Sequence, residues 1–196
     1  MTRSKIPQFL VLILFQVLPV IIVLYHMYNY NKSTENPGWI FEQHTGCKFY
    51  TGRNYENRDF VWNGDCQEGF VHGFGELTLF QNGLEYYAFE GFLSKGRFEG
   101  AGKLIIRSDG DTYEGNYEDG KPNGFGHFYN DDGDHYEGTY KEGIRSGNGT
   151  YWYSPESNLF KYEGEWKEGR ENGKGTLFYR NGKKKSGTFK DGFLEE

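Results

Sequence analysis

The sequence predicts an all-β protein, a single-layer antiparallel array of β-hairpin repeats preceded by one transmembrane helix. Three observations lead to this fold class. The 196 residues include 29 glycines, and 19 % of them are aromatic. The glycines recur in a fixed register, and one long stretch near the N-terminus carries no charge. Glycine supplies turn geometry and aromatic residues favour strands, whereas disordered chains are poor in aromatic residues.

The uncharged stretch runs from Ile6 to Tyr25 and reads IPQFLVLILFQVLPVIIVLY. Twenty helical residues span roughly 30 Å, the thickness of the hydrocarbon core of a bilayer. A buried core helix is the alternative, but no other part of the chain has a helical pattern that could surround it. We therefore predict that residues 6–25 span a membrane, within an N-terminal region of residues 1–28.

This segment is expected to be an uncleaved signal-anchor, with secretion after cleavage as the alternative. Its apolar core is long, and residues 26–31 (HMYNYN) lack the small residues of a cleavage site. Arg3 and Lys5 precede the core, and only Lys32 follows it closely. The positive-inside bias then leaves the N-terminus in the cytoplasm and the repeat domain outside it, in a periplasm or lumen.

The glycine register defines the repeat. Each repeat begins with a lead glycine, and a second glycine follows five positions later. In the first five repeats, further glycines follow at plus nine and plus eleven. The lead glycines are Gly64, Gly91, Gly115, Gly138, Gly164 and Gly187. Five full copies and a truncated sixth in one register indicate a repeat protein.

The spacing has a physical interpretation. Residues two apart in a strand face the same side, so Tyr113, Gly115 and Tyr117 should share a face, as should Gly124, Gly126 and Phe128 of the next strand. An aromatic ring of one strand can then lie over the bare glycine backbone of its neighbour. The plus-five glycine falls in a turn, where positive φ is cheap for glycine. The next turn is marked by Asn82-Gly83, Asp109-Gly110, Asp132-Gly133 and Asn181-Gly182.

The pattern resembles the MORN repeat, whose form is close to Y-E-G-x-W/Y-x-x-G-x-x-x-G-x-G. The best matches begin at Tyr113 (YEGNYEDGKPNGFG), Tyr136 (YEGTYKEGIRSGNG) and Tyr162 (YEGEWKEGRENGKG). The resemblance covers about residues 60–196 and implies stacked hairpins, each too small to be stable alone. It divides the chain into a linker (29–45), an N-terminal cap with a first atypical repeat (46–86), and repeats with a truncated last copy (87–196).

The two cysteines lie in the cap. In the first repeat Trp62 replaces the tyrosine and Cys66 replaces the second aromatic, and Cys47 lies just ahead of the array. The cap also looks like that of exported bacterial MORN proteins, in which a cysteine precedes W-x-G-x-C-x-x-G. The resemblance and the expected oxidising compartment together imply a Cys47–Cys66 disulfide. Two free buried thiols are the alternative.

The sequence contains no clear catalytic, cofactor-binding or metal-binding motif, and we expect no enzyme activity, no cofactor and no metal. The histidines lack ligand spacing with either cysteine. Asn130–Asp134 resembles a calcium loop superficially but lacks the trailing glutamate and lies at a predicted turn. The recurring Glu114, Glu137 and Glu163 indicate solvation or cross-strand pairing. No nucleophile or nucleotide motif stands out.

The expected function is a membrane-held binding or scaffold module for an unknown protein partner. MORN proteins generally mediate protein contacts or self-association, and an open array also leaves edge strands exposed. Tyr117, Tyr140 and Trp166 are candidate binding-surface residues, with packing inside the array as the alternative. Other candidate functions are an accessory subunit of a separate enzyme and a phospholipid-binding module. Residues 32–196 carry a net charge of −8 (20 basic, 28 acidic), which disfavours nucleic acid and anionic lipid.

Overall fold

The computed structural model describes residues 38–52 and 57–195, and these residues form an all-β structure. The predicted membrane segment 6–25 and most of the linker lie outside the described residues. Within the described ranges, no helix is long and apolar enough to cross a membrane.

The described residues form one open sheet of fifteen strands. The strands are β1 (Trp39–Phe41), β2 (Lys48–Tyr50), β3 (Arg58–Trp62), β4 (Asp65–Gln67), β5 (Phe70–Gln81), β6 (Leu84–Ser94), β7 (Arg97–Ile106), β8 (Thr112–Glu118), β9 (Lys121–Tyr129), β10 (His135–Lys141), β11 (Ile144–Trp152), β12 (Leu159–Lys167), β13 (Arg170–Tyr179), β14 (Lys184–Lys190) and β15 (Phe193–Leu194).

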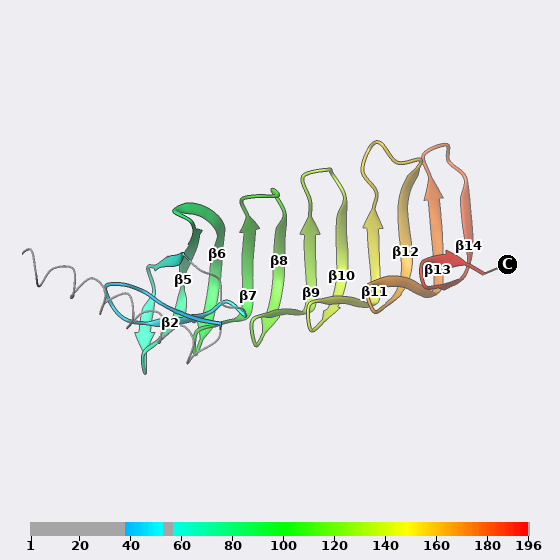
Figure 1. The fold of residues 1–196 in the computed structure, drawn as a ribbon. Helices are drawn as coiled ribbons and strands as arrows, with labels where there is room; N and C mark the ends of the chain where they lie inside the picture. Colours follow the sequence, from blue (N-terminus) through cyan, green and yellow to red (C-terminus); the bar gives the residue numbers. More distant parts are fainter. Residues whose placement is uncertain (1–37, 53–56, 196) are drawn as a thin grey trace, which may run out of the picture. The chain divides into compact units, whose positions relative to one another are not determined.

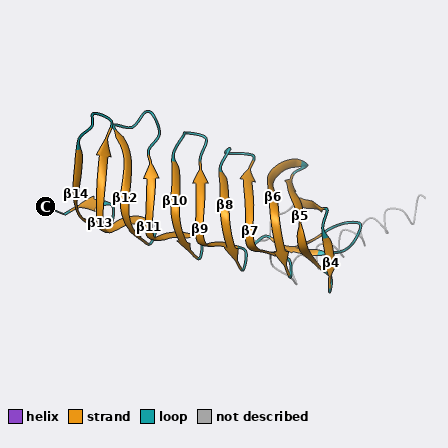
Figure 2. Cartoon of the chain, turned by 180° about the vertical axis from the view of Figure 1, so that it is seen from behind, coloured by secondary structure: helices purple, strands orange, loops and turns teal. Residues whose placement is uncertain are grey.

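From β5 to β15 each strand pairs antiparallel with the next strand in the sequence (Figure 1). The strands β3 and β4 both pair with β5, because the first repeat's leading strand is interrupted around Gly64. The strand β2 pairs with β5 in parallel at Lys48 and Phe70. Seen from behind, β4 lies beside β5 at the start of the same series (Figure 2). The predicted antiparallel hairpin array is therefore present.

By its contacts the chain divides into two compact units. The first comprises residues 1–39 and 51–55, and in its described part the Thr51 N–H donates to the Gly38 carbonyl at 2.7 Å. The second comprises residues 40–50 and 56–196 and contains the repeats.

The plus-five glycines lie where the sequence predicted tight turns. In each repeat the residue before this glycine and the glycine itself both have positive φ, as in Asp119 (49°) and Gly120 (81°). Two successive positive φ angles define a type I′ turn, whose twist matches that of the paired strands. The same geometry recurs at Glu68-Gly69, Lys95-Gly96, Glu142-Gly143, Glu168-Gly169 and Asp191-Gly192.

The plus-nine glycines differ from the expected regular strand. Gly124 has a φ of 88°, and at this point the ladder between β8 and β9 shifts. Gly115 pairs with Gly126 and Tyr117 pairs with Pro122, so β9 has two more residues than β8 between these pairs. The same bulge recurs in the following repeats at Gly147 and Gly173.

Candidate functional site

A row of glycines crosses the sheet at right angles to the strands. Each glycine pairs with a glycine of the next strand, from β5 to β14. The row consists of Gly75, Gly91, Gly102, Gly115, Gly126, Gly138, Gly149, Gly164, Gly175 and Gly187. It contains five of the six predicted lead glycines and all five plus-eleven glycines. The remaining lead residue, Gly64, lies between β3 and β4 under the ring of Trp62.

In the four repeats from Phe89 to Tyr162, the first aromatic lies over two glycines of this row. A Cβ added to Gly126 would lie 2.6 Å from Cζ of Tyr113, and one added to Gly175 would lie 2.5 Å from Cζ of Tyr162. Such a contact is closer than carbon atoms can approach. Each of these tyrosines also donates its hydroxyl to the carbonyl three residues later, with Tyr113 bonding Asn116 at 3.1 Å. The glycines therefore allow the ring to lie flat on the backbone.

The aromatic side chains on this side form a continuous ladder. For example, Tyr113 contacts Tyr117 of its own repeat and Tyr140 of the next repeat. All the pairs of this kind are T-shaped, with ring centroids 4.9–5.4 Å apart. We call this the ladder face and define it by Phe89, Tyr117, Tyr113, Tyr140, Tyr136, Trp166, Tyr162 and Phe189. Burial raises the pKa of Tyr113, Tyr136 and Tyr162 to about 12, because a phenolate would lose its hydration there.

The three candidate surface aromatics belong to this ladder. The side chains of Tyr117, Tyr140 and Trp166 are only 3 %, 9 % and 4 % exposed. The structure thus brings them together, but as packing between neighbouring repeats rather than on an accessible surface.

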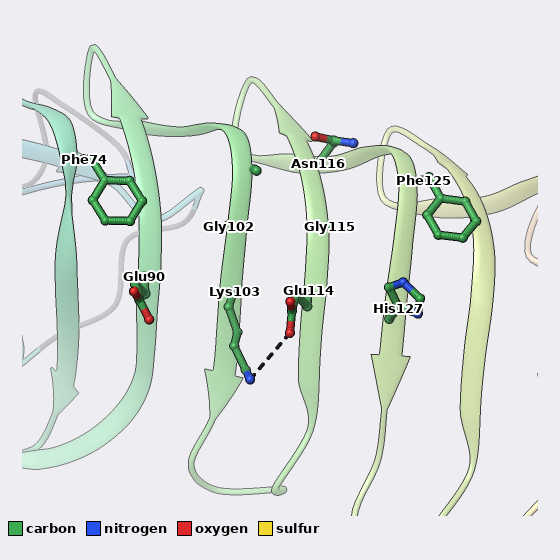
Figure 3. A pocket seen from close by; sticks show the side chains of 10 residues that line it. Phe74, Glu90, Gly102, Lys103, Glu114, Gly115, Asn116, Phe125 and His127 are labelled. Carbon is green, nitrogen blue, oxygen red and sulfur yellow. Dashed lines mark ion pairs between the residues drawn. The ribbon is translucent and has the colours of Figure 1, made fainter.

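The opposite side of the sheet, which we call the open face, carries the side chains that alternate with the ladder residues. A groove of about 520 Å³ crosses it over β5 to β9 (Figure 3). Phe74 and Phe125 lie toward its two ends, and Asn116 lies between them. The groove residues are Phe74, Glu90, Ala101, Gly102, Lys103, Glu114, Gly115, Asn116, Phe125 and His127. Phe74 is 68 % exposed and Phe125 is 48 % exposed.

A row of mainly acidic side chains crosses the open face, and its middle members Glu90, Lys103, Glu114 and His127 line the groove. The strand register aligns Glu76, Glu90, Lys103, Glu114, His127 and Glu137 on successive strands. The Lys103 ammonium lies 3.5 Å from a Glu114 oxygen, and Nδ1 of His127 lies 3.8 Å from Glu137. Of the recurring glutamates, Glu114 and Glu137 are thus exposed and paired across strands, whereas Glu163 pairs with Lys161 of its own strand.

A second row of the open face continues beyond the groove. The His135 ring stacks on Trp152 with centroids 4.1 Å apart and on Tyr129 at 5.4 Å. Burial between the two rings lowers the pKa of His135, since the imidazolium is less well hydrated there. Further along this row, Lys161 lies over the Phe178 ring at 4.8 Å. These residues were not predicted from the sequence, because the residue types at these positions differ between repeats.

The cap contains the predicted disulfide. Cys47 and Cys66 are bonded, with their Cα atoms 6.0 Å apart. Cys47 is 1 % exposed, and Phe49 beside it contacts Phe60 and Phe98 with ring centroids 5.7 Å and 5.4 Å away. The bond therefore ties the segment before the array to the first repeat.

Metal-binding geometry is not found in the part of the chain described: no three His, Cys, Asp or Glu side chains there are grouped to hold an ion. The loop Asn130–Asp134 is closed by its own hydrogen bonds, from the Asp134 N–H to the Asn130 side-chain oxygen at 2.8 Å and from the Asn130 N–H to the Asp134 carbonyl. It is a turn, as predicted from its position in the repeat.

Comparison with known proteins agrees with this geometry. The family model described as the MORN repeat matches residues 113–135, 136–156 and 162–184. A search of curated proteins returned no match. The matched residues are those whose tyrosines cover the glycine row between β8 and β13. Residues 113–184 of this chain are therefore MORN repeats.

Proposed function

We propose that this chain is a binding or scaffold protein that uses the open face of its sheet to contact a protein partner. The observation that carries the proposal is the contrast between the two faces. The aromatic side chains of the ladder face are buried against one another, whereas Phe74 and Phe125 of the open face are exposed and line a groove. Exposed aromatic side chains grouped with polar ones are typical of interaction surfaces.

Catalysis by the chain itself is not part of this proposal. The groove is open to solvent, and the pairs Lys103–Glu114 and His127–Glu137 are cross-strand ion pairs rather than a cluster around a nucleophile. An enzyme site would need a nucleophile or acid–base pair held in reach of a bound substrate.

We also propose that residues 6–25 hold the protein in a membrane and that the repeats lie outside the cytoplasm. The twenty uncharged residues support the first part. The Cys47–Cys66 disulfide supports the second, since disulfides persist mainly in oxidising compartments. A C-terminal reporter that is active only outside the cytoplasm should be active and retained in the membrane fraction. An inactive reporter would contradict this topology.

Site-specific photo-cross-linking tests the binding role. The full-length chain would carry benzoylphenylalanine at Phe125 in the groove and, as a matched control, at Phe193, which is 78 % exposed near the C-terminus. Both changes keep an aromatic ring. We expect a discrete cross-linked partner from position 125 and none of the same mass from position 193. No discrete product from position 125 in the native host would overturn the proposal.

A further inference from the structure

One part of the open face combines two features that folding does not require. On the paired strands β5 and β6, Glu76 lies directly opposite Glu90, and Phe74 lies directly opposite Phe92. Both pairs point to the open face, because their neighbours Leu77, Phe89 and Leu93 are buried on the other side. Two like charges and two apolar rings therefore lie side by side.

Neither carboxylate forms an ion pair with a described residue: Lys103, opposite Glu90, pairs with Glu114 instead, and Glu76 accepts only a hydrogen bond from the Asn63 side chain at 3.3 Å. Like charges directly opposite each other on neighbouring strands are destabilising. Elsewhere in this row a carboxylate is paired with a base, as in Glu114 with Lys103 and Glu137 with His127. Among the described residues, no basic group lies within ion-pair distance of Glu76 or Glu90. A cation supplied from outside would relieve the repulsion.

The aromatic pair is exposed next to these charges. Phe74 is 68 % exposed and Phe92 is 38 % exposed. From Phe74 the groove continues across the sheet to Phe125 on β9. With strands about 4.8 Å apart, the distance from β5 to β9 is about 19 Å, the length of about six extended residues. The groove is thus long enough for a short extended peptide.

Resting on the proposed binding role, we propose that this groove binds an extended, basic segment of the partner protein. Lysine or arginine side chains of that segment lie at Glu76 and Glu90, and apolar side chains alternate with them to cover Phe74, Phe92 and Phe125. Charge complementarity selects a basic peptide, since residues 32–196 carry a net charge of −8. The same charge opposes nucleic acid and anionic lipid headgroups.

The test uses the full-length protein in a neutral detergent and three fluorescein-labelled ten-residue peptides. One alternates Arg and Leu, one alternates Arg and Ser, and one alternates Glu and Leu. Fluorescence anisotropy should show the tightest binding for Arg–Leu, weaker binding for Arg–Ser and none for Glu–Leu. Equal binding of Arg–Leu and Glu–Leu would overturn the charge requirement, and equal binding of Arg–Leu and Arg–Ser would overturn the apolar one.

Matched variants locate the site. The double variant Glu76→Gln/Glu90→Gln should weaken Arg–Leu binding about fivefold, because two exposed ion pairs are lost. The control Glu156→Gln/Glu168→Gln removes the same charge from two turns outside the groove and should leave the dissociation constant unchanged. The first variant should melt no lower than wild type, since it removes a repulsion. Equal weakening by both double variants would overturn the proposed site.

The two proposals can fail separately. If the cross-linker at Phe125 captures a partner whose binding is unaffected by Glu76→Gln/Glu90→Gln, the basic-segment proposal fails and the binding role stands. If no partner is captured there, the binding role itself fails.

Discussion

The substitution Gly149→Ala tests whether the glycine row exists to admit the tyrosine rings. The new methyl group would lie 2.5 Å from Cζ and 2.6 Å from Cε2 of Tyr136, whereas carbon atoms in contact are about 3.5–4.0 Å apart. The ring would have to move by about 1 Å. Tyr136 is fully buried, and its ring centroid lies 5.3 Å from Tyr140 and 5.1 Å from Trp166, so little room is available.

The expected loss follows from two opposing effects. Overpacking a core costs about 1–3 kcal/mol, and we take the upper end because the ring is held on both sides. Replacing glycine by alanine also lowers the entropy of the unfolded chain, which restores up to about 1 kcal/mol. We therefore expect Gly149→Ala to lower the free energy of unfolding by about 2 kcal/mol.

Urea denaturation of the full-length chain, followed by tryptophan fluorescence, measures this change. The same substitution would also be made together with Tyr136→Leu, which removes the ring that the methyl group strikes. There the added cost of Gly149→Ala should fall close to zero. Gly182→Ala is the control: a methyl group there would meet no other atom, but the φ of 82° disfavours alanine. The loss of stability caused by Gly182→Ala should therefore be the same with and without the Tyr136 ring. A Gly149→Ala protein as stable as wild type, or an equal loss with and without the ring, would refute the reasoning.

Further predictions concern the cap, the ladder and the turns. Replacing Cys47 and Cys66 by serine should lower the free energy of unfolding by about 3 kcal/mol, and dithiothreitol should then have no further effect on the melting temperature. Tyr117→Phe should leave stability unchanged or raise it by about 1 kcal/mol in urea denaturation, because the buried Tyr117 hydroxyl has no hydrogen-bond partner among the described residues. By contrast, Tyr136→Phe removes a bonded hydroxyl and should lower stability by about 1 kcal/mol. Burial raises the pKa of Tyr136 from 10.0 to about 12, so the ladder should be fully stable below pH 10. Its stability should fall as the pH rises from 10 to 12, because only the unfolded chain ionises freely there; denaturation midpoints across this range check the sign. Glu168→Asn should raise the melting temperature slightly, since asparagine tolerates the φ of 52° better than glutamate.

The parts of the fold that follow from local spacing could be predicted from the sequence. The alternation of Tyr113, Gly115 and Tyr117 was sufficient to predict a ring lying over a glycine. The glycine at plus five was sufficient to predict a tight turn, because positive φ is cheap for that residue. The bulge at Gly124 was not predicted, since strand periodicity assumes that paired strands have equal numbers of residues between pairs.

The groove could not be predicted in the same way. Its residues come from three repeats and meet only through the register that pairs Gly75 with Gly91 and Gly102 with Gly115. A repeat alignment emphasises what the copies share, whereas Phe74, Lys103 and Phe125 are positions at which they differ. Those differences were the available signal. The aromatics that recur, such as Tyr140 and Trp166, proved to be ladder residues instead.

Hydroxyl-radical footprinting of the full-length protein tests the central claim most directly, namely that aromatic packing occupies one face and leaves the other accessible. Mass spectrometry would locate oxidation in folded and in urea-unfolded protein. We predict that Phe74, Phe125 and Tyr129 are oxidised in the folded state, while Tyr136, Tyr162 and Trp166 are protected until the chain unfolds. Rapid oxidation of Trp166 in the folded protein, together with protection of Phe74 and Phe125, would contradict the account.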